Sequence, residues 1–507
     1  MKLLALATVV AIALVMGVLL MPSSDGRGPA QTRVPKKPNV VMLILDEFPG
    51  DALLGRGGRI DRVRYPNFAA LADDGYWFRN AWSAYDSTPK AVPLIMDGMR
   101  PYKNQTADPK GHPRTIFDLF GRRGYRMRVS EEATRICPPR WCRPMPRPSI
   151  LGNLGADRPQ RLDAFFRTIK PGKRPGFWLK HALLPHNPFR FLPDGSQTTA
   201  GSPDPIRGLN RPAGFHDEFL TRHNEQRFLL QLGFMDRELG KLMRRLRRNG
   251  MYDKTMIVVV ADHGFAWQAG VSNRRRVIQG NVAEVAPVPF FVKPAGRRRG
   301  VVNDSYVSTV DVTPTIADLL NRRLPYRADG RSAFSRAVRK RRALRIPGRD
   351  FDFTVRISGR EWERRRRAVV ARRLRMFGSG ETGFYSGIGP NSELVGEAVS
   401  ELRTAGAAAV SGALVKPGAW RNVRRASGVV PVHVTGSFRG GRRGARRAIA
   451  VVVNGRVEAV GRTFYLHGDP VEHFAAMVPE ASLREGRNDV QVFEVGRGSS
   501  LRLAAQD

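Results

Sequence analysis

Two continuous apolar runs, each followed at once by residues that can bind a metal, constrain the fold of this chain most. The first run, NVVMLIL, is followed by Asp46 and Glu47, and the second, TMIVVVA, is followed by Asp262 and His263. Uninterrupted apolar runs are typical of strands buried on both faces of a helix-covered sheet. In open parallel α/β sheets the ligand site lies beyond the carboxyl ends of the strands. A lone Asp at a strand end usually caps the next helix, but two such ends together predict a metal site at one edge.

Helical patterns separate these strands and set the domain organisation. Residues 66–78, 114–125 and 229–252 are helical stretches that alternate with short strands. This alternation predicts a doubly wound α/β sheet. Because 507 residues exceed what one hydrophobic core usually serves, we expect more than one domain. The expected segments are a membrane anchor or signal segment (1–22), a linker (23–37), the α/β domain (38–335), a basic connector with a helical segment (336–425) and a small β domain (426–507).

The pattern changes near the C-terminus. From about Val429 the chain reads as short alternating strands, and Asn454-Gly455 is a typical two-residue hairpin turn. These features predict a small domain resembling a β-sandwich. It contains no cluster of candidate catalytic residues, so we expect it to have a packing or polymer-binding role.

The charge of the chain is strongly basic. It carries 85 Lys and Arg against 45 Asp and Glu, a net charge of +40. Such an excess suits nucleic acid, an anionic membrane surface or an acidic envelope polymer. The arginines are scattered and no recognised nucleic-acid module accompanies them, so we expect no nucleic-acid partner and favour an anionic membrane surface.

The N-terminal segment and the cysteines bear on localisation. Leu3–Met21 is free of charge, almost wholly apolar and about long enough to span a bilayer, which predicts an uncleaved anchor with the rest of the chain extracytoplasmic. The positive-inside rule favours the opposite orientation, because more Lys and Arg follow the segment than precede it. Cys137 and Cys142 are the only thiols, and a local pair of this kind predicts a disulfide loop in an oxidising compartment.

The stretch YDSTPKAVPLIMDG, Tyr85 to Gly98, places two hydroxyls before a proline. Ser or Thr followed by Pro is typical of a helix N-cap with proline at the first helical position. The same hydroxyls, Ser87 and Thr88, are also candidate nucleophiles, and the residues alone leave both readings open.

Taken together, several segments between about Pro38 and Phe334 resemble the sulfatase-like branch of the alkaline phosphatase superfamily. In chain order, the segments that carry the resemblance are PNVVMLILDEFPGD, YPNFAALADDGYWFRNAWSAYDSTPKAVPLIMDG, LKHALLPHNPFRFLPDG, FMDRELGKLMRRL, YDKTMIVVVADHG, VPFFVKPAG and VDVTPTIADLL. The resemblance implies an alkaline-phosphatase-like sheet with helices on both faces.

The resemblance also implies where the nucleophile lies. Sulfatases carry a Cys or Ser nucleophile, a Pro two residues on, an Arg two beyond that, and a closing Thr-Gly. Ser87 has the proline spacing through Pro89, but Ala91 stands at the arginine position. Counted back from Gly98, the nucleophile falls on Thr88, which resembles the phosphoglycerol and phosphoethanolamine transferases. We therefore predict Thr88, and a formylglycine-bearing sulfatase is not expected because no cysteine is present there.

A metal ion would make such a threonine reactive, because it lowers the pKa of the hydroxyl, orients it and takes up charge during displacement. The expected ligands are Asp46, Thr88, Asp262 and His263. Three oxygens and one imidazole favour zinc or manganese, with calcium and magnesium as alternatives. Glu47 either completes the ligand shell or caps the following turn.

Proton transfer and charge binding require further residues. The segment LKHALLPHNPF supplies His181 and His186 and is similar to the His-x-Pro-His-type segment of the family, and we favour His186 as the proton donor. Either histidine could instead have a packing role. Lys90 and the run Arg274 to Arg276 could hold anionic oxygens, or they are solvated.

These expectations define a metal-dependent extracytoplasmic hydrolase or transferase. It acts through Thr88 on phosphate or sulfate esters of cell-envelope lipids or glycans. The alternatives are a true sulfuric ester hydrolase and a catalytically inactive protein that binds envelope polymers.

Overall fold

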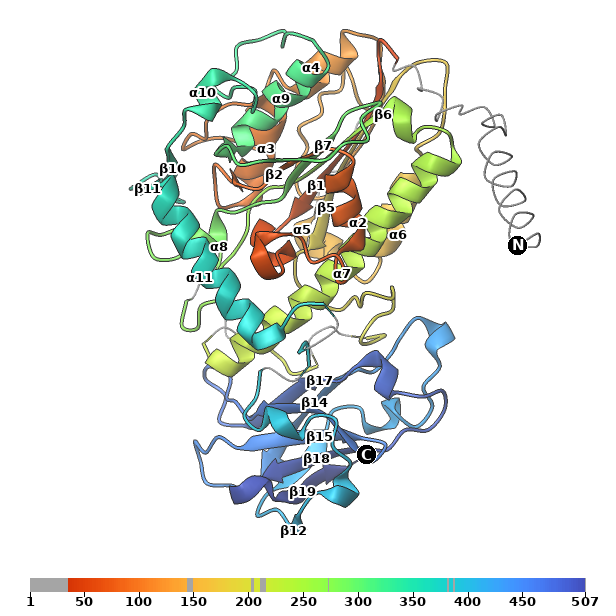
Figure 1. Cartoon of the computed structure of the whole chain (residues 1–507), viewed down its shortest axis with the longest axis vertical. Coiled ribbons are helices and arrows are strands. Elements are labelled where there is room, and N and C mark those ends of the chain that lie inside the picture. Colours follow the sequence, from red (N-terminus) through yellow and green to blue (C-terminus); the bar gives the residue numbers. More distant parts are fainter. Residues whose placement is uncertain are drawn as a thin grey trace, which may run out of the picture.

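The computed structural model describes residues 35–143, 149–201, 205–209, 216–271, 273–380, 383–385 and 388–506. The expected anchor, Leu3–Met21, lies outside these ranges. Among the described ranges, no helix combines the length and the apolar character needed to cross a membrane. The chain forms an α/β unit and, below it in Figure 1, a β unit (residues 391–506).

A seven-stranded sheet forms the centre of the α/β unit. In spatial order its strands are β4 (Arg126–Glu131), β5 (Gly176–Pro185), β1 (Asn39–Asp46), β6 (Thr255–Ala261), β7 (Phe290–Lys293), β2 (Tyr76–Phe78) and β8 (Val301–Asn303). β7 runs antiparallel to both its neighbours, whereas the other pairs are parallel. The predicted α/β class is confirmed, and β7 makes the sheet mixed rather than wholly parallel.

The two apolar runs are the adjacent strands β1 and β6. Both are almost entirely buried, as their lack of polar residues requires. They pair in parallel with Leu45 opposite Ala261. The residues that come next in register, Asp46 and Asp262, therefore lie side by side at the carboxyl end of the sheet.

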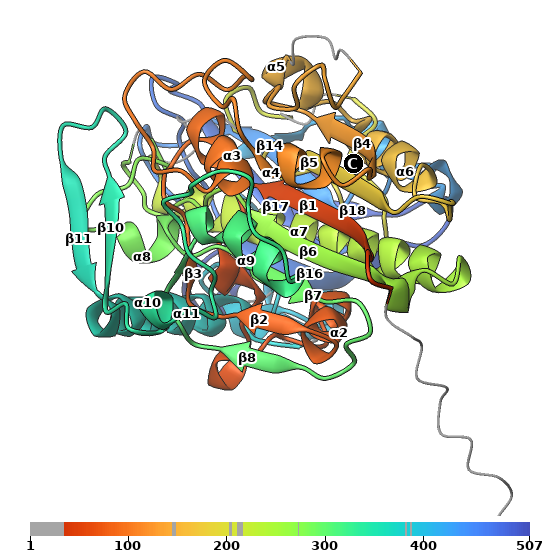
Figure 2. The ribbon, with the colours of Figure 1, turned by 90° about the horizontal axis from the view of Figure 1, so that it is seen from above.

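Helices cover both faces of the sheet (Figure 2). One group, α2, α6 and α7, packs on one face, and α3, α4 and α9 pack on the other. The helix bounds are α2 (Pro66–Asp73), α3 (Thr88–Asp97), α4 (Ile116–Gly121), α5 (Ile150–Asn153), α6 (Arg158–Arg167), α7 (Glu218–Arg248), α8 (Val282–Val285), α9 (Val312–Leu319), α10 (Arg336–Arg339) and α11 (Gly359–Phe377). The Cys137–Cys142 disulfide is formed, as predicted.

The segment expected to be a basic connector is largely part of the α/β unit. Its hairpin, β10 (Ala343–Pro347) with β11 (Thr354–Ser358), and helix α11 share an apolar cluster with Trp82 and α8. Arg366 of α11 is buried and forms a two-pronged ion pair with Asp51 at 2.6 and 2.8 Å. The sequence could not show this ion pair, because Asp51 lies 315 positions from Arg366.

Two packed sheets form the β unit. One has the order β12 (Thr404–Ala407), β19 (Leu501–Gln506), β18 (Val490–Val495), β15 (Ala448–Val453), β16 (Arg456–Arg462), and the other the order β13 (Ser411–Leu414), β14 (His433–Arg439), β17 (Glu472–Met477). Their inner faces share one apolar core, as expected for a sandwich. The predicted turn at Asn454-Gly455 joins β15 to β16, with φ of 50° and 82° at its two residues.

Candidate active site

Helix α3 begins at Thr88, with Ser87 as its N-cap residue and Gly98 ending it at φ 70°. The helix start and the candidate nucleophile thus lie in the same stretch. The Thr88 hydroxyl lies 3.3 Å from Asp46 Oδ1 and 3.2 Å from His263 Nε2. The Ser87 side chain makes no capping hydrogen bond to the helix. Of the two hydroxyls, the structure brings that of Thr88 to the strand-end acids.

The four predicted metal ligands lie together and are all buried. Asp262 Oδ1 accepts the backbone N–H groups of His263 at 2.6 Å and Glu47 at 3.2 Å, which fixes the carboxylate. His263 Nδ1 donates to the Gly264 carbonyl at 2.9 Å, because a carbonyl can only accept. The other ring nitrogen, Nε2, faces Thr88 and Asp262, and in the neutral tautomer that donates from Nδ1 it offers a lone pair to a metal.

His181 joins this group from the neighbouring strand β5. Asp46, His181 and Asp262 each offer one possible metal-ligand atom, and these three atoms lie within 4.8 Å of one another. The sequence suggested a proton donor at His181, whereas its position on β5 places it among residues that can bind a metal. Burial lowers the pKa of His181 to about 4, so the ring is neutral, the form that coordinates metals. Sequence spacing gave no sign of this, because β5 and β1 are adjacent only in the folded sheet.

The site has the features of a cation site. Both ring nitrogens of His181 and Oδ2 of Asp262 are buried without a hydrogen-bond partner among the described residues. Burial and the charges of Asp262 and Glu47 raise the pKa of Asp46 well above its usual value. Buried acids of like charge are expensive unless a positive charge compensates them. A divalent cation held by Asp46, Thr88, Asp262, His263 and His181 would satisfy these groups.

Glu47 faces a second set of charges. Its Oε2 accepts from Arg274 at 2.6 Å, and its Oε1 lies 3.4 Å from Arg275 Nε and 3.5 Å from His186 Nε2. Burial opposes its ionisation, but Arg274, His186 and Arg275 outweigh that effect and lower its pKa. Its φ of 55° is an uncommon conformation for a side-chain-bearing residue, of the kind found at functional sites. Glu47 therefore links the metal ligands to the arginines.

The backbone around His186 is firmly held. Arg158 Nη1 donates to the Leu183 and His186 carbonyls, and Gln231 Nε2 donates to the His186 carbonyl. The ring donates from Nδ1 to the Asn187 carbonyl at 2.5 Å, so Nε2 faces Glu47. Burial lowers the pKa of His186 to about 4. The neutral ring carries no proton at Nε2, so in this form it can accept a proton there but not donate one, which differs from the donor role that the sequence reading favoured.

Lys90 is directed elsewhere. Its ammonium donates to the carbonyls of Tyr102 at 3.0 Å and Lys103 at 2.5 Å and lies over the Phe351 ring. Among the described residues it has no recorded contact with the metal ligands. The structure does not bring Lys90 to the candidate site.

The sequence reading missed Asp86 and Arg349. Asp86, beside the N-cap of α3, accepts from the Val277 N–H at 2.8 Å and from Arg349 Nε at 3.3 Å. These bonds tie the arginine loop 274–276 and the tip of the β10–β11 hairpin to the start of α3. Arg349 is 263 positions from Asp86, so no local spacing could reveal the pair.

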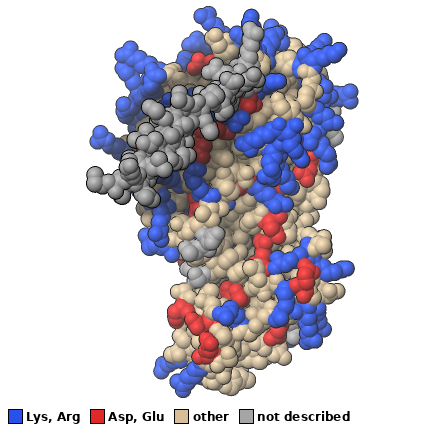
Figure 3. Space-filling model, turned by 45° about the vertical axis from the view of Figure 1, so that its right-hand side comes forward, with Lys and Arg blue, Asp and Glu red and all other residues tan. Residues whose placement is uncertain are grey.

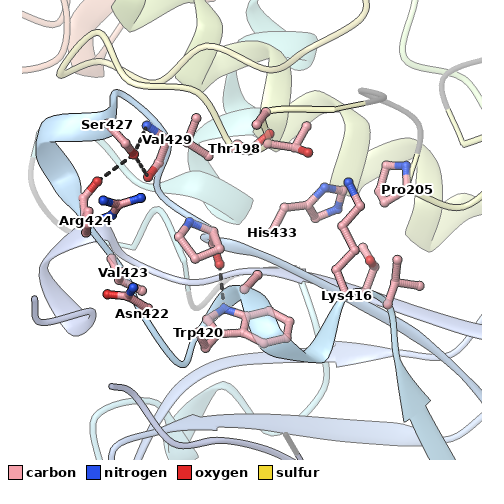
Figure 4. A pocket seen from close by; sticks show the side chains of 16 residues that line it. Thr198, Pro205, Lys416, Trp420, Asn422, Val423, Arg424, Ser427, Val429 and His433 are labelled. Atoms are coloured by element: carbon pink, nitrogen blue, oxygen red, sulfur yellow. Dashed lines mark hydrogen bonds between the residues drawn. The ribbon is translucent and has the colours of Figure 1, made fainter. Parts of the chain in front are cut away.

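A separate cavity of about 280 Å³ lies at the junction with the β unit (Figure 4). Trp420 and His433 line it from the β unit and Thr198 from the α/β unit. Lys416 and Arg424 also reach it. None of the predicted metal ligands or catalytic residues lines this cavity. The candidate chemistry therefore resides in the α/β unit.

Comparisons with known proteins agree with this placement. A sequence model of the family described as Sulfatase matches residues 38–322. A multifunctional alkaline phosphatase superfamily protein, PehA of Trinickia caryophylli, is 34% identical over 96 residues, 18% of each chain. An arylsulfatase of Clostridium perfringens is 22% identical over 382 residues, covering 58% of this chain and 77% of that one. The phosphonate monoester hydrolase structure of Agrobacterium radiobacter is 17% identical with a TM-score of 0.41, covering 61% of this chain and 80% of that one.

Proposed function

The chain belongs to the sulfatase family and is a hydrolase, and on that premise we propose that it cleaves phosphate or sulfate esters through Thr88 at a metal centre. The family is metal-dependent, and the buried cluster around Asp46 and Asp262 suits a divalent cation. The threonine nucleophile and the choice of ester are the parts of this proposal that need testing.

One observation carries the proposal. The Thr88 hydroxyl lies at the N-terminus of α3, within 3.3 Å of Asp46 and His263, at the carboxyl edge of the sheet. A threonine hydroxyl is a weak nucleophile unless a base or a cation activates it. When bound, a divalent cation would lower the pKa of the hydroxyl and stabilise charge on the ester oxygens. Ser87, the adjacent hydroxyl, lacks recorded contacts with these groups.

The reaction proceeds in two displacements. The Thr88 hydroxyl loses its proton as Oγ forms a bond to the phosphorus or sulfur atom, and the ester oxygen leaves with the bonding electron pair and takes up a proton in exchange, so that one proton is released and one is consumed. Water then attacks the same atom, the bond to Thr88 breaks, and the hydroxyl is restored. His186 Nε2, neutral and unprotonated, is placed to accept the proton of that water.

The charges at the rim favour an anionic substrate. The Arg275 side chain is about one third exposed and faces the acidic cluster. The negative charge of Glu47 is the main cause that raises its pKa. A guanidinium in this position can bind the non-reacting oxygens of a sulfate or phosphate group. Arg274 is committed to Glu47 and fixes the loop that carries Arg275.

We place the reaction outside the cytoplasm, on esters of envelope lipids or glycans. The apolar segment Leu3–Met21 and the Cys137–Cys142 disulfide support this localisation. Transfer to an acceptor hydroxyl in place of water uses the same intermediate and is the second candidate, supported by the choice of threonine. An inactive binding protein is disfavoured, because the set of ligand-capable side chains is complete.

The test compares two adjacent hydroxyls. Thr88→Ala and Ser87→Ala are assayed on nitrophenyl sulfate, a nitrophenyl phosphomonoester and a nitrophenyl phosphodiester, with zinc or manganese added. We expect Thr88→Ala to lose at least about 10³-fold in kcat, since the covalent route disappears, and Ser87→Ala to stay within about fivefold. Full turnover by Thr88→Ala, with loss in Ser87→Ala, would reverse the assignment.

A further inference from the structure

The end of the sheet opposite the candidate site is lined with exposed cations. We call it the amino edge: the segments that precede β1, β4, β5 and β6, together with the β7–β8 turn. The parallel pairing of β4, β5, β1 and β6 brings their starts to one side of the unit. Exposed basic residues there include Lys36, Lys37, Lys170, Lys173, Arg174 and Lys254.

The end of helix α7 adds a basic hollow to this edge. A depression of about 480 Å³ lies between α6 and α7. Its basic lining residues are Arg167, Lys241, Arg244, Arg245, Arg247 and Arg248. Asp163 is its single acidic lining residue, and Lys241 lies 3.9 Å from it. The hollow thus presents an excess of positive charge on a scale that suits an anionic headgroup.

The few acids near this edge are already neutralised. Asp253 pairs with Arg298 at 2.7 Å, and Asp74 lies 3.8 Å from Arg247. By contrast, no carboxylate of the described residues is recorded within 4.0 Å of Lys173, Arg174, Arg244 or Arg248. These cations are therefore available to an external anion. Figure 3, turned so that the right-hand side of Figure 1 comes forward, shows Lys and Arg gathered over the α/β unit.

The chain enters the fold at this same edge. Lys37 Nζ donates to the Arg123 carbonyl at 3.4 Å, and Tyr125 Oη donates to the Pro38 carbonyl at 3.0 Å. In the sequence, residues 22–36 separate Lys37 from the apolar segment Leu3–Met21. A fully extended chain of that length reaches at most about 54 Å. The apolar segment and the basic edge can thus meet one surface.

We propose that the amino edge docks on an anionic lipid bilayer. Attraction to such a surface is strong only within about a Debye length, roughly 10 Å, so the exposed side chains of this edge would provide it. The eight residues of β1 separate this edge from Asp46 by about 26 Å. Docking in this orientation leaves the candidate active site facing away from the bilayer, so of the proposed substrates it favours esters of envelope glycans over esters of lipids in that bilayer. A soluble polyanion is the competing partner. A lipid bilayer is favoured because the chain that follows the apolar segment Leu3–Met21 enters the fold at this same edge.

The test measures hydrogen exchange of the full chain in lipid nanodiscs. One disc contains phosphatidylcholine alone and the other about one third phosphatidylglycerol. The apolar segment is present in both, so only the surface charge differs. We expect amides at 170–175, 246–254 and 296–300 to exchange at least about threefold more slowly on the anionic disc, and the protection to vanish in 0.5 M salt.

A charge-reversed variant identifies the surface responsible. Lys173→Glu/Arg174→Glu/Arg244→Glu/Arg248→Glu should abolish the lipid-dependent protection. A matched variant, Arg439→Glu/Arg442→Glu/Arg443→Glu/Arg487→Glu, reverses as many exposed charges on the β unit and should retain it. Melting curves of both variants establish that they are folded. Equal exchange on the two discs would overturn the proposal, as would protection by dextran sulfate but not by phosphatidylglycerol. Since catalysis is not measured, failure here would leave the Thr88 assignment intact.

Discussion

The two ends of the central sheet use ionisable residues in opposite ways. At the carboxyl edge Asp46, Asp262 and His181 are buried and short of partners. At the amino edge Arg244, Arg248 and their neighbours are exposed to water. Burying a charge is costly unless a counter-charge compensates it, whereas an exposed charge costs little. The first arrangement is therefore explained by a bound cation and chemistry, and the second by long-range attraction.

The largest difference in bound metal and in kcat should appear when one carboxylate is removed at each edge of the sheet. Asp262→Asn should lose bound metal and at least about 10³-fold in kcat, because the cation loses a charged ligand that the fold holds in place. Asp163→Asn, on the basic hollow, should keep both within about twofold. Metal content by mass spectrometry and turnover of a nitrophenyl ester check this pair. Unchanged metal in Asp262→Asn would remove the metal site from the carboxyl edge.

The second prediction concerns two candidate catalytic residues from the sequence, His186 and Lys90, whose substitutions should differ in their effect on kcat. We expect His186→Asn to lower kcat by about 10- to 100-fold, since proton transfer is impaired while the metal ligands remain. Lys90→Met should change kcat by less than about threefold, because its ammonium is held by two loop carbonyls. Steady-state kinetics on the same ester test the difference. A larger loss in Lys90→Met than in His186→Asn would mean that Lys90 turns toward the substrate.

Metal removal should affect stability as well as activity. A ligand at about 1,000 times its Kd adds about 4 kcal/mol to the free energy of unfolding. Chelation should therefore lower the Tm of the α/β unit by several degrees, while the Tm of Asp262→Asn should not respond. Calorimetry of each protein with and without chelator checks this. An equal response in both would place the stabilising metal elsewhere.

The smallest effect on turnover should come from the amino edge. The Lys173→Glu/Arg174→Glu/Arg244→Glu/Arg248→Glu variant should hydrolyse a small soluble ester within about twofold of wild type, because the edge lies about 26 Å from Asp46. Assays at low and high salt measure this. A strong loss with a small ester would show that the two edges do not act independently.

Much of the site at the carboxyl edge could be predicted from the sequence, because the signals that place its residues lie close to them in the chain. Apolar runs fix β1 and β6, and the residue after each run must lie at the strand end, which places Asp46 and Asp262. Capping chemistry predicted a helix start with proline at the first helical position, and α3 begins one residue earlier, at Thr88, without a capping hydrogen bond from Ser87. The family resemblance, applied by counting back from Gly98, favoured Thr88 over Ser87, and the structure brings Thr88 to the acids.

The remaining site residues depend on tertiary contacts that no spacing encodes. His181 was kept only as a second candidate for proton transfer, because its neighbour in the sheet, β1, lies far away in sequence. Arg349 lies in a stretch that was expected to be a basic connector, yet its hairpin packs on the α/β unit beside α3. The antiparallel strand β7 was missed for a related reason, because strand direction leaves no mark on apolar periodicity.

The most direct test of the account is to trap the covalent intermediate. Wild type, Ser87→Ala and Thr88→Ala are mixed with excess ester and metal, quenched in acid during steady-state turnover and mapped by peptide mass spectrometry. We predict that the Thr88 peptide gains one phosphoryl or sulfuryl group in wild type and Ser87→Ala, and not in Thr88→Ala. A modification on Ser87, or label that persists in Thr88→Ala, would contradict the account.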